Sequence, residues 1–168
     1  MRLSLLNFFF IAVLAGCSTN RPQELSGKVE GILDRAEKSA SPGGRKVLAK
    51  SRSMVEDGEI LKGGCWDFIN EVYNRSGYPT KKRTTIFRTK KSGPYVDQKK
   101  IQPGDWLYFI NHSYKKIDHS GMFVSWVNFE NKVALIMSYA GEKRRTPARY
   151  QNYDLTNVYS IIRPSVAP

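Results

Sequence analysis

The hydrophobic positions in the first half of the chain recur at helical spacing. Between Leu25 and Ala36 they fall on one face, which predicts a helix, and the segment Val47–Val55 is typical of a second helix. Pro42-Gly43-Gly44 is expected to separate the two. A third helix is predicted directly after Gly63-Gly64, with an apolar face formed by Phe68, Ile69, Val72 and Tyr73.

Beyond residue 105 the hydrophobic period changes to two, which is typical of strands. The predicted strands are Trp106–Ile110, Gly121–Phe129, Val133–Ala140 and Asn157–Ile162, with a hairpin turn at 129–132. Between Lys81 and Lys100, eight Lys or Arg residues accompany one acid, Asp97, and we interpret this stretch as a long basic loop. Helices followed by strands predict an α+β fold, in which N-terminal helices pack on a C-terminal antiparallel sheet.

The first 16 residues have the pattern of a signal peptide. Arg2 precedes an apolar run from Leu3 to Leu14, which is too short to span a bilayer because a spanning helix needs roughly 20 residues. Leu14-Ala15-Gly16-Cys17 resembles the lipobox of bacterial lipoproteins, which implies cleavage before Cys17 and lipid attachment to it. We therefore expect a signal peptide at 1–16, a lipidated tether at 17–24 and a single domain at 25–168.

The residue after Cys17 and the net charge of the chain indicate its location and its binding partners. Ser18 follows Cys17, and in many Gram-negative envelopes an Asp there retains lipoproteins at the inner membrane, so its absence indicates the outer membrane, facing the periplasm. The chain carries 27 Lys and Arg against 15 Asp and Glu, a net charge of +12. Such a surplus favours anionic partners, here peptidoglycan or another anionic wall polymer, and export argues against nucleic acid. We expect a monomer attached to the membrane by lipid on Cys17.

Cys65 is the candidate nucleophile. It is the only cysteine besides Cys17, and it lies at the start of the third predicted helix, where the helix dipole and free N–H groups favour the thiolate. The chain has two histidines, and His119, at the opening of a predicted strand, is a better candidate base than His112, which lies in a predicted exposed loop. No metal or cofactor is expected, because these few ligands fall short of a zinc site.

Three short motifs resemble the NlpC/P60 family of cysteine peptidases and the related CHAP amidases. They are Gly64-Cys65-Trp66-Asp67-Phe68 at a helix start, Pro103-Gly104-Asp105 before a strand, and His119-Ser120-Gly121 on the next strand. The resemblance implies a papain-like fold in which the Cys65 thiolate attacks amide bonds of peptidoglycan stem peptides and His119 acts as general base. The family usually has Asp-Cys-Ser-Gly at the nucleophile, so Trp66 beside the thiol is a departure from its pattern.

The third catalytic position of the family, a polar residue on the following strand, has no histidine here. A hairpin turn centred on Glu130-Asn131 places Ser138 beside His119, whereas a three-residue turn selects Tyr139, and Glu142 is a further alternative. We predict Ser138 as the third member. The sequence thus indicates a cell-envelope cysteine hydrolase, and the alternative is a non-catalytic relative that binds cell wall or a partner protein.

Overall fold

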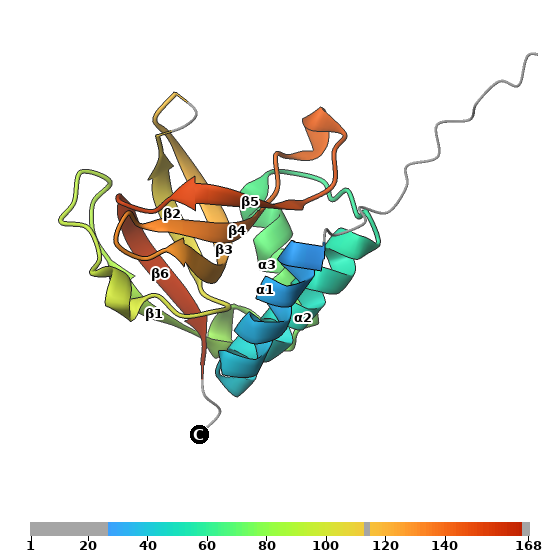
Figure 1. The fold of residues 1–168 in the computed structure, drawn as a ribbon. Helices are drawn as coiled ribbons and strands as arrows, with labels where there is room; N and C mark the ends of the chain where they lie inside the picture. Colours follow the sequence, from blue (N-terminus) through green and yellow to red (C-terminus); the bar gives the residue numbers. More distant parts are fainter. Residues whose placement is uncertain (1–26, 113–114, 166–168) are drawn as a thin grey trace, which may run out of the picture.

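The architecture is α+β, with three α-helices packed on a six-stranded antiparallel sheet in the part of the chain that the structure describes (Figure 1). The structure is a computed structural model that describes residues 27–112 and 115–165. The predicted signal peptide, Cys17 and the tether lie outside these residues. The helices are α1 (Gly27–Ser39), α2 (Pro42–Glu56) and α3 (Cys65–Arg75). The strands are β1 (Arg83–Arg88), β2 (Trp106–Asn111), β3 (Ile117–Asn128), β4 (Val133–Ser138), β5 (Arg149–Asp154) and β6 (Val158–Pro164), in the order β1-β6-β2-β3-β4-β5.

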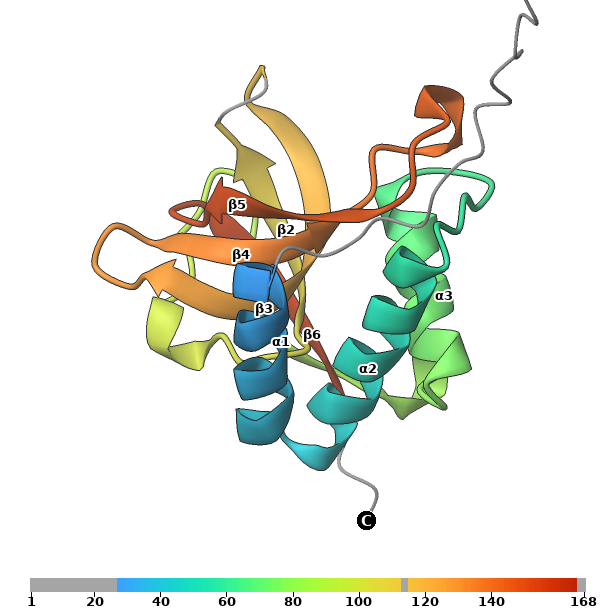
Figure 2. The same ribbon diagram turned by 45° about the vertical axis from the view of Figure 1, so that its right-hand side comes forward.

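All three helices lie against the same face of the sheet (Figure 2). Helices α1 and α3 pack on β3, and α2 packs on β6. Neighbouring residues of a strand point to opposite faces, so Trp106 joins the core beneath the helices while Leu107 joins a second core on the other face. His119 lies opposite Phe109 in the β2–β3 pairing and therefore belongs to the second face. None of the helices in the described ranges has the length and hydropathy needed to cross a membrane.

The first helix ends before Pro42-Gly43-Gly44, as predicted, but these residues do not lie between the two helices, because they form the first turn of α2. Ser41 caps this helix by accepting a hydrogen bond from the Gly44 N–H at 3.1 Å. Proline suits the first helical position, since its fixed φ is already helical and its missing N–H would have had no partner there. The three residues therefore start the second helix, and the chain turns at Ala40-Ser41.

The predicted basic loop is also wrong in part, because it contains β1 and two short 3-10 turns. Strand β5 was not expected at all. Both strands form the edges of the sheet, where one side of the backbone has no neighbouring strand and polar side chains are frequent. Strand β3 starts at Ile117, four residues before the predicted boundary, which places His119 within the strand. The turn at 129–132 is confirmed.

Candidate active site

The start of α3 is fixed by its own first turn. Gly63 has a φ of +101°, and a Cβ there would lie 2.2 Å from the Asp67 carboxylate, so a side chain is excluded at this position. The space is filled by Asp67, whose Oδ2 accepts a hydrogen bond from the Gly64 N–H at 2.7 Å. Cys65 follows as the first residue of the helix. Its backbone N–H is one of the four that an α-helix leaves without an internal partner.

Two residues after β4 hold the loop that precedes Cys65. The Tyr139 hydroxyl donates to the Leu61 carbonyl at 2.7 Å. Glu142 binds Gly63 twice, since its backbone N–H donates to the Gly63 carbonyl at 2.9 Å and its carboxylate accepts from the Gly63 N–H at 3.3 Å. Tyr139 and Glu142, the two alternatives for the third catalytic position, therefore fix the backbone before the thiol, and these hydrogen bonds go to Leu61 and Gly63 and not to His119.

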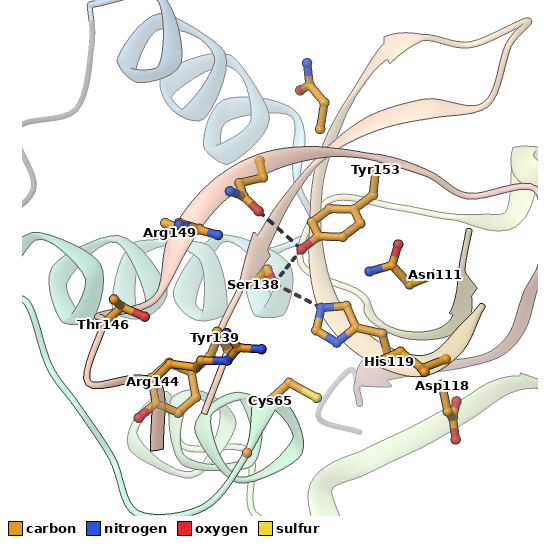
Figure 3. A pocket seen from close by; sticks show the side chains of 15 residues that line it. Cys65, Asn111, Asp118, His119, Ser138, Tyr139, Arg144, Thr146, Arg149 and Tyr153 are labelled. Atoms are coloured by element: carbon orange, nitrogen blue, oxygen red, sulfur yellow. Dashed lines mark hydrogen bonds between the residues drawn. The ribbon is translucent and has the colours of Figure 1, made fainter. Parts of the chain in front are cut away.

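The thiol of Cys65 points toward the imidazole of His119 (Figure 3). Burial raises the pKa of Cys65, but hydrogen bonds from His119 and Ser120 and the charge of His119 outweigh it, so that the pKa falls from 9.0 to about 7. Ser120 is buried and contributes to this lowering of the Cys65 pKa. About half of a thiol with this pKa is thiolate at neutral pH, and the thiolate is the nucleophile.

A series of hydrogen-bonded polar side chains orients the His119 imidazole through Nε2, on the side away from Cys65. His119 Nε2 lies 3.0 Å from Ser138 Oγ, and Ser138 Oγ lies 2.9 Å from the Tyr153 hydroxyl (Figure 3). The Gln151 amide follows at 3.3 Å from Tyr153, and with its oxygen turned toward Arg149 it accepts from Nε at 2.7 Å and Nη2 at 3.1 Å. Because Nε2 is held by Ser138, the other ring nitrogen, Nδ1, faces the sulfur.

The imidazole is also held by aromatic rings. Phe109 meets the His119 ring edge-on with centroids 5.4 Å apart, and the Tyr153 ring lies 5.6 Å away on another side. Ring packing and the Ser138 contact together leave the imidazole little rotational freedom. A base whose orientation is fixed in advance loses little conformational entropy on reaching the transition state.

Cys65 and His119 open into a cavity of about 980 Å³, which β3, β4, β5 and the segment between β4 and β5 enclose. Asp118 lies at its rim beside His119 and is bound by the Lys91 ammonium and the Tyr159 hydroxyl. Ligand-binding pockets in proteins have volumes of roughly 300–1,000 Å³. The cavity is therefore large enough for a short peptide, with the thiol exposed to it.

The structure brings together three of the residues singled out in the sequence: Cys65, His119 and Ser138. His112 lies in an exposed turn, as expected. Asp105 of the Pro-Gly-Asp motif is fully buried, accepts from the Gln102 N–H at 2.8 Å and binds Arg163, so its role is structural.

Sequence reasoning missed the residues of β5, Arg149, Gln151 and Tyr153. They alternate along one strand, but the sequence of β5 shows no alternation of apolar and polar residues. The strand was not recognised because its cavity-facing residues are polar.

Within the described residues, no group of three or more His, Cys, Asp or Glu side chains is placed to hold a metal ion. Comparisons with protein-family models, with curated proteins and with solved structures found no match.

Proposed function

We propose that the chain is a cysteine hydrolase that cleaves peptide amide bonds of peptidoglycan, with Cys65 as nucleophile and His119 as general base. One observation carries the proposal: the Cys65 thiol and the His119 imidazole face each other in an open cavity, and Ser138 holds the imidazole from behind. A buried structural cysteine needs none of these partners. We also propose that the α+β fold is papain-like and of the NlpC/P60 type. A cysteine at a helix start and a histidine on a following strand support this assignment.

Cys65, His119 and the start of α3 supply the groups needed for both steps of such a reaction, formation of a thioester and its hydrolysis. The Cys65 thiolate attacks the amide carbon, and a backbone N–H at the start of α3 can donate to the resulting oxyanion. The C–N bond then breaks while the imidazolium gives its proton to the leaving amine. A water molecule next attacks the thioester carbon and passes a proton to His119, and the C–S bond breaks to release the carboxylic acid and restore the thiolate.

The cell-envelope location is part of the proposal and rests on the sequence. Leu14-Ala15-Gly16-Cys17 supports lipidation at Cys17, and Ser18 supports the outer membrane, with the domain facing the periplasm. The net charge of +12 suits a partner that is an anionic wall polymer. Lipid at Cys17 would keep the domain close to such a polymer.

The direct test is mass spectrometry of muropeptides after the full chain has been incubated with purified sacculi. We expect new amines and shortened stem peptides with the wild type, and none with Cys65→Ala. His119→Ala should lose most of the activity, whereas His112→Ala, the other histidine of the chain, should keep it. Wild-type activity in Cys65→Ala would end the hydrolase proposal. Binding to sacculi without any cleavage would support the alternative, a non-catalytic wall-binding module.

A further inference from the structure

Two arginines line the same cavity as the thiol. Arg144 lies in the 3-10 turn Glu142–Arg144, and Arg149 is the first residue of β5. Figure 3 places both on the side of Cys65 away from Asp118. The cavity therefore has two chemically different ends, one with guanidinium groups and one with a carboxylate.

The charges at these two ends are not equivalent. Asp118 is the acidic residue among those that line the described cavity, and Lys91 and Tyr159 bind its two oxygens. At the arginine end the neighbouring Lys143 and Arg145 add positive charge, and the acid of that turn, Glu142, is directed at the Gly63 N–H. The arginine end thus has a net positive potential that favours an anionic group entering the cavity.

Arg149 is held in place before any ligand arrives. The Gln151 amide oxygen accepts from its Nε and Nη2, and Arg149 lies opposite Ser138 in the β4–β5 pairing. A guanidinium carries five N–H donors in a planar fork, so the contact with Gln151 leaves donors for a second acceptor. The fork matches the two oxygens of a carboxylate.

We propose that Arg144 and Arg149 form a subsite that binds a free carboxylate of the substrate, within one or two residues of the amide bond that Cys65 attacks. The proposal rests on the hydrolase function above and adds a substrate class to it, acidic peptides with a carboxylate next to the scissile bond. Neutral peptides of the same length lack the group that the two guanidinium groups bind.

The test compares soluble muropeptides with the same muropeptides after their carboxylates have been converted to carboxamides with carbodiimide and ammonia. A hydrogen bond to a charged group is worth enough to change affinity by about 10- to 100-fold. We therefore expect the wild type to prefer the carboxylate form by that factor in kcat/KM. Arg149→Gln and Arg144→Gln should each remove most of this preference, because they slow the carboxylate form far more than the carboxamide form. Lys143→Gln, in the same turn but outside the cavity lining, should retain it.

A loss of the same size on both substrate forms, or a preference that survives in the double variant, would overturn the subsite. Binding of both peptide forms to Cys65→Ala, measured by calorimetry, separates this failure from a failure of the hydrolase proposal. If the wild type cleaves neither form but Cys65→Ala prefers the carboxylate peptide through Arg149, the subsite stands and the hydrolase falls. If Cys65→Ala binds both forms equally, the subsite is wrong whatever the catalytic result.

Discussion

Replacing Ser138 by alanine tests whether the Ser138 hydroxyl orients the His119 imidazole. The pKa of Cys65 is about 7, against 9.0 for an ordinary thiol, a difference worth about 3 kcal/mol in favour of the thiolate at about 1.4 kcal/mol per pKa unit. The Ser138 hydroxyl contributes by accepting a hydrogen bond from the imidazolium at 3.0 Å, and a hydrogen bond to a charged group is worth about 1.5–3 kcal/mol. Ser138→Ala should therefore raise the thiol pKa by about one to two units.

The assay is the rate of alkylation by iodoacetamide as a function of pH, in a Cys17→Ala background so that Cys65 is the single thiol. Because the thiolate reacts, the rate rises with pH through the thiol pKa. The midpoint should lie near 7 in the parent chain and between about 8 and 9 in Ser138→Ala. Ser138→Thr, which keeps the hydroxyl, should restore it, and Ser160→Ala, a buried serine without a hydrogen-bond partner, is the matched control. A Ser138→Ala midpoint within about 0.3 units of the parent would refute the reasoning.

Asp105→Ala should lower the free energy of unfolding by about 3–5 kcal/mol, because it leaves the mostly buried Arg163 without its carboxylate; urea denaturation measures this, and a loss below about 1 kcal/mol would contradict it. Gly121→Ala should cost about 1–3 kcal/mol in the same assay, since its Cβ would lie 2.3 Å from Ile136 Cγ2, and the added change Ile136→Ala should return part of the loss. Radiolabelled palmitate should enter the wild-type chain and not Cys17→Ala, and equal labelling of both would exclude lipidation at Cys17.

The candidate site was largely predictable because its chemistry is carried by rare residues. The chain has two cysteines and two histidines, so the choice of Cys65 and His119 needed only a helix start and a strand. Ser138 was chosen as a polar residue on the neighbouring strand, and its contact with His119 is present at 3.0 Å. Its exact position depends on two bulges in the β3–β4 pairing, which a simple count of residues across the hairpin does not include. Local pattern was sufficient for Cys65 and His119.

The rest of the site depends on features that hydrophobic patterns do not carry. Strand β5 is an edge strand whose cavity-facing residues are polar, so nothing in its hydropathy distinguishes it from a loop. The loop before Cys65 is fixed by Tyr139 and Glu142, which lie 78 and 79 residues away from Leu61 and Gly63 in the sequence. Contacts this distant become visible only when the sheet order is known.

The contacts of Cys65 with His119 and Ser120 also span a long stretch of sequence, and they determine when the sulfur becomes reactive. In the unfolded chain Cys65 is separated by more than 50 residues of sequence from His119 and Ser120, the two residues that lower its pKa. Until β3 has joined the sheet, the sulfur has the ordinary pKa of 9.0 and is mostly protonated at neutral pH. Folding of the C-terminal half therefore activates Cys65, whose thiol is less reactive toward other thiols and oxidants before β3 is in place.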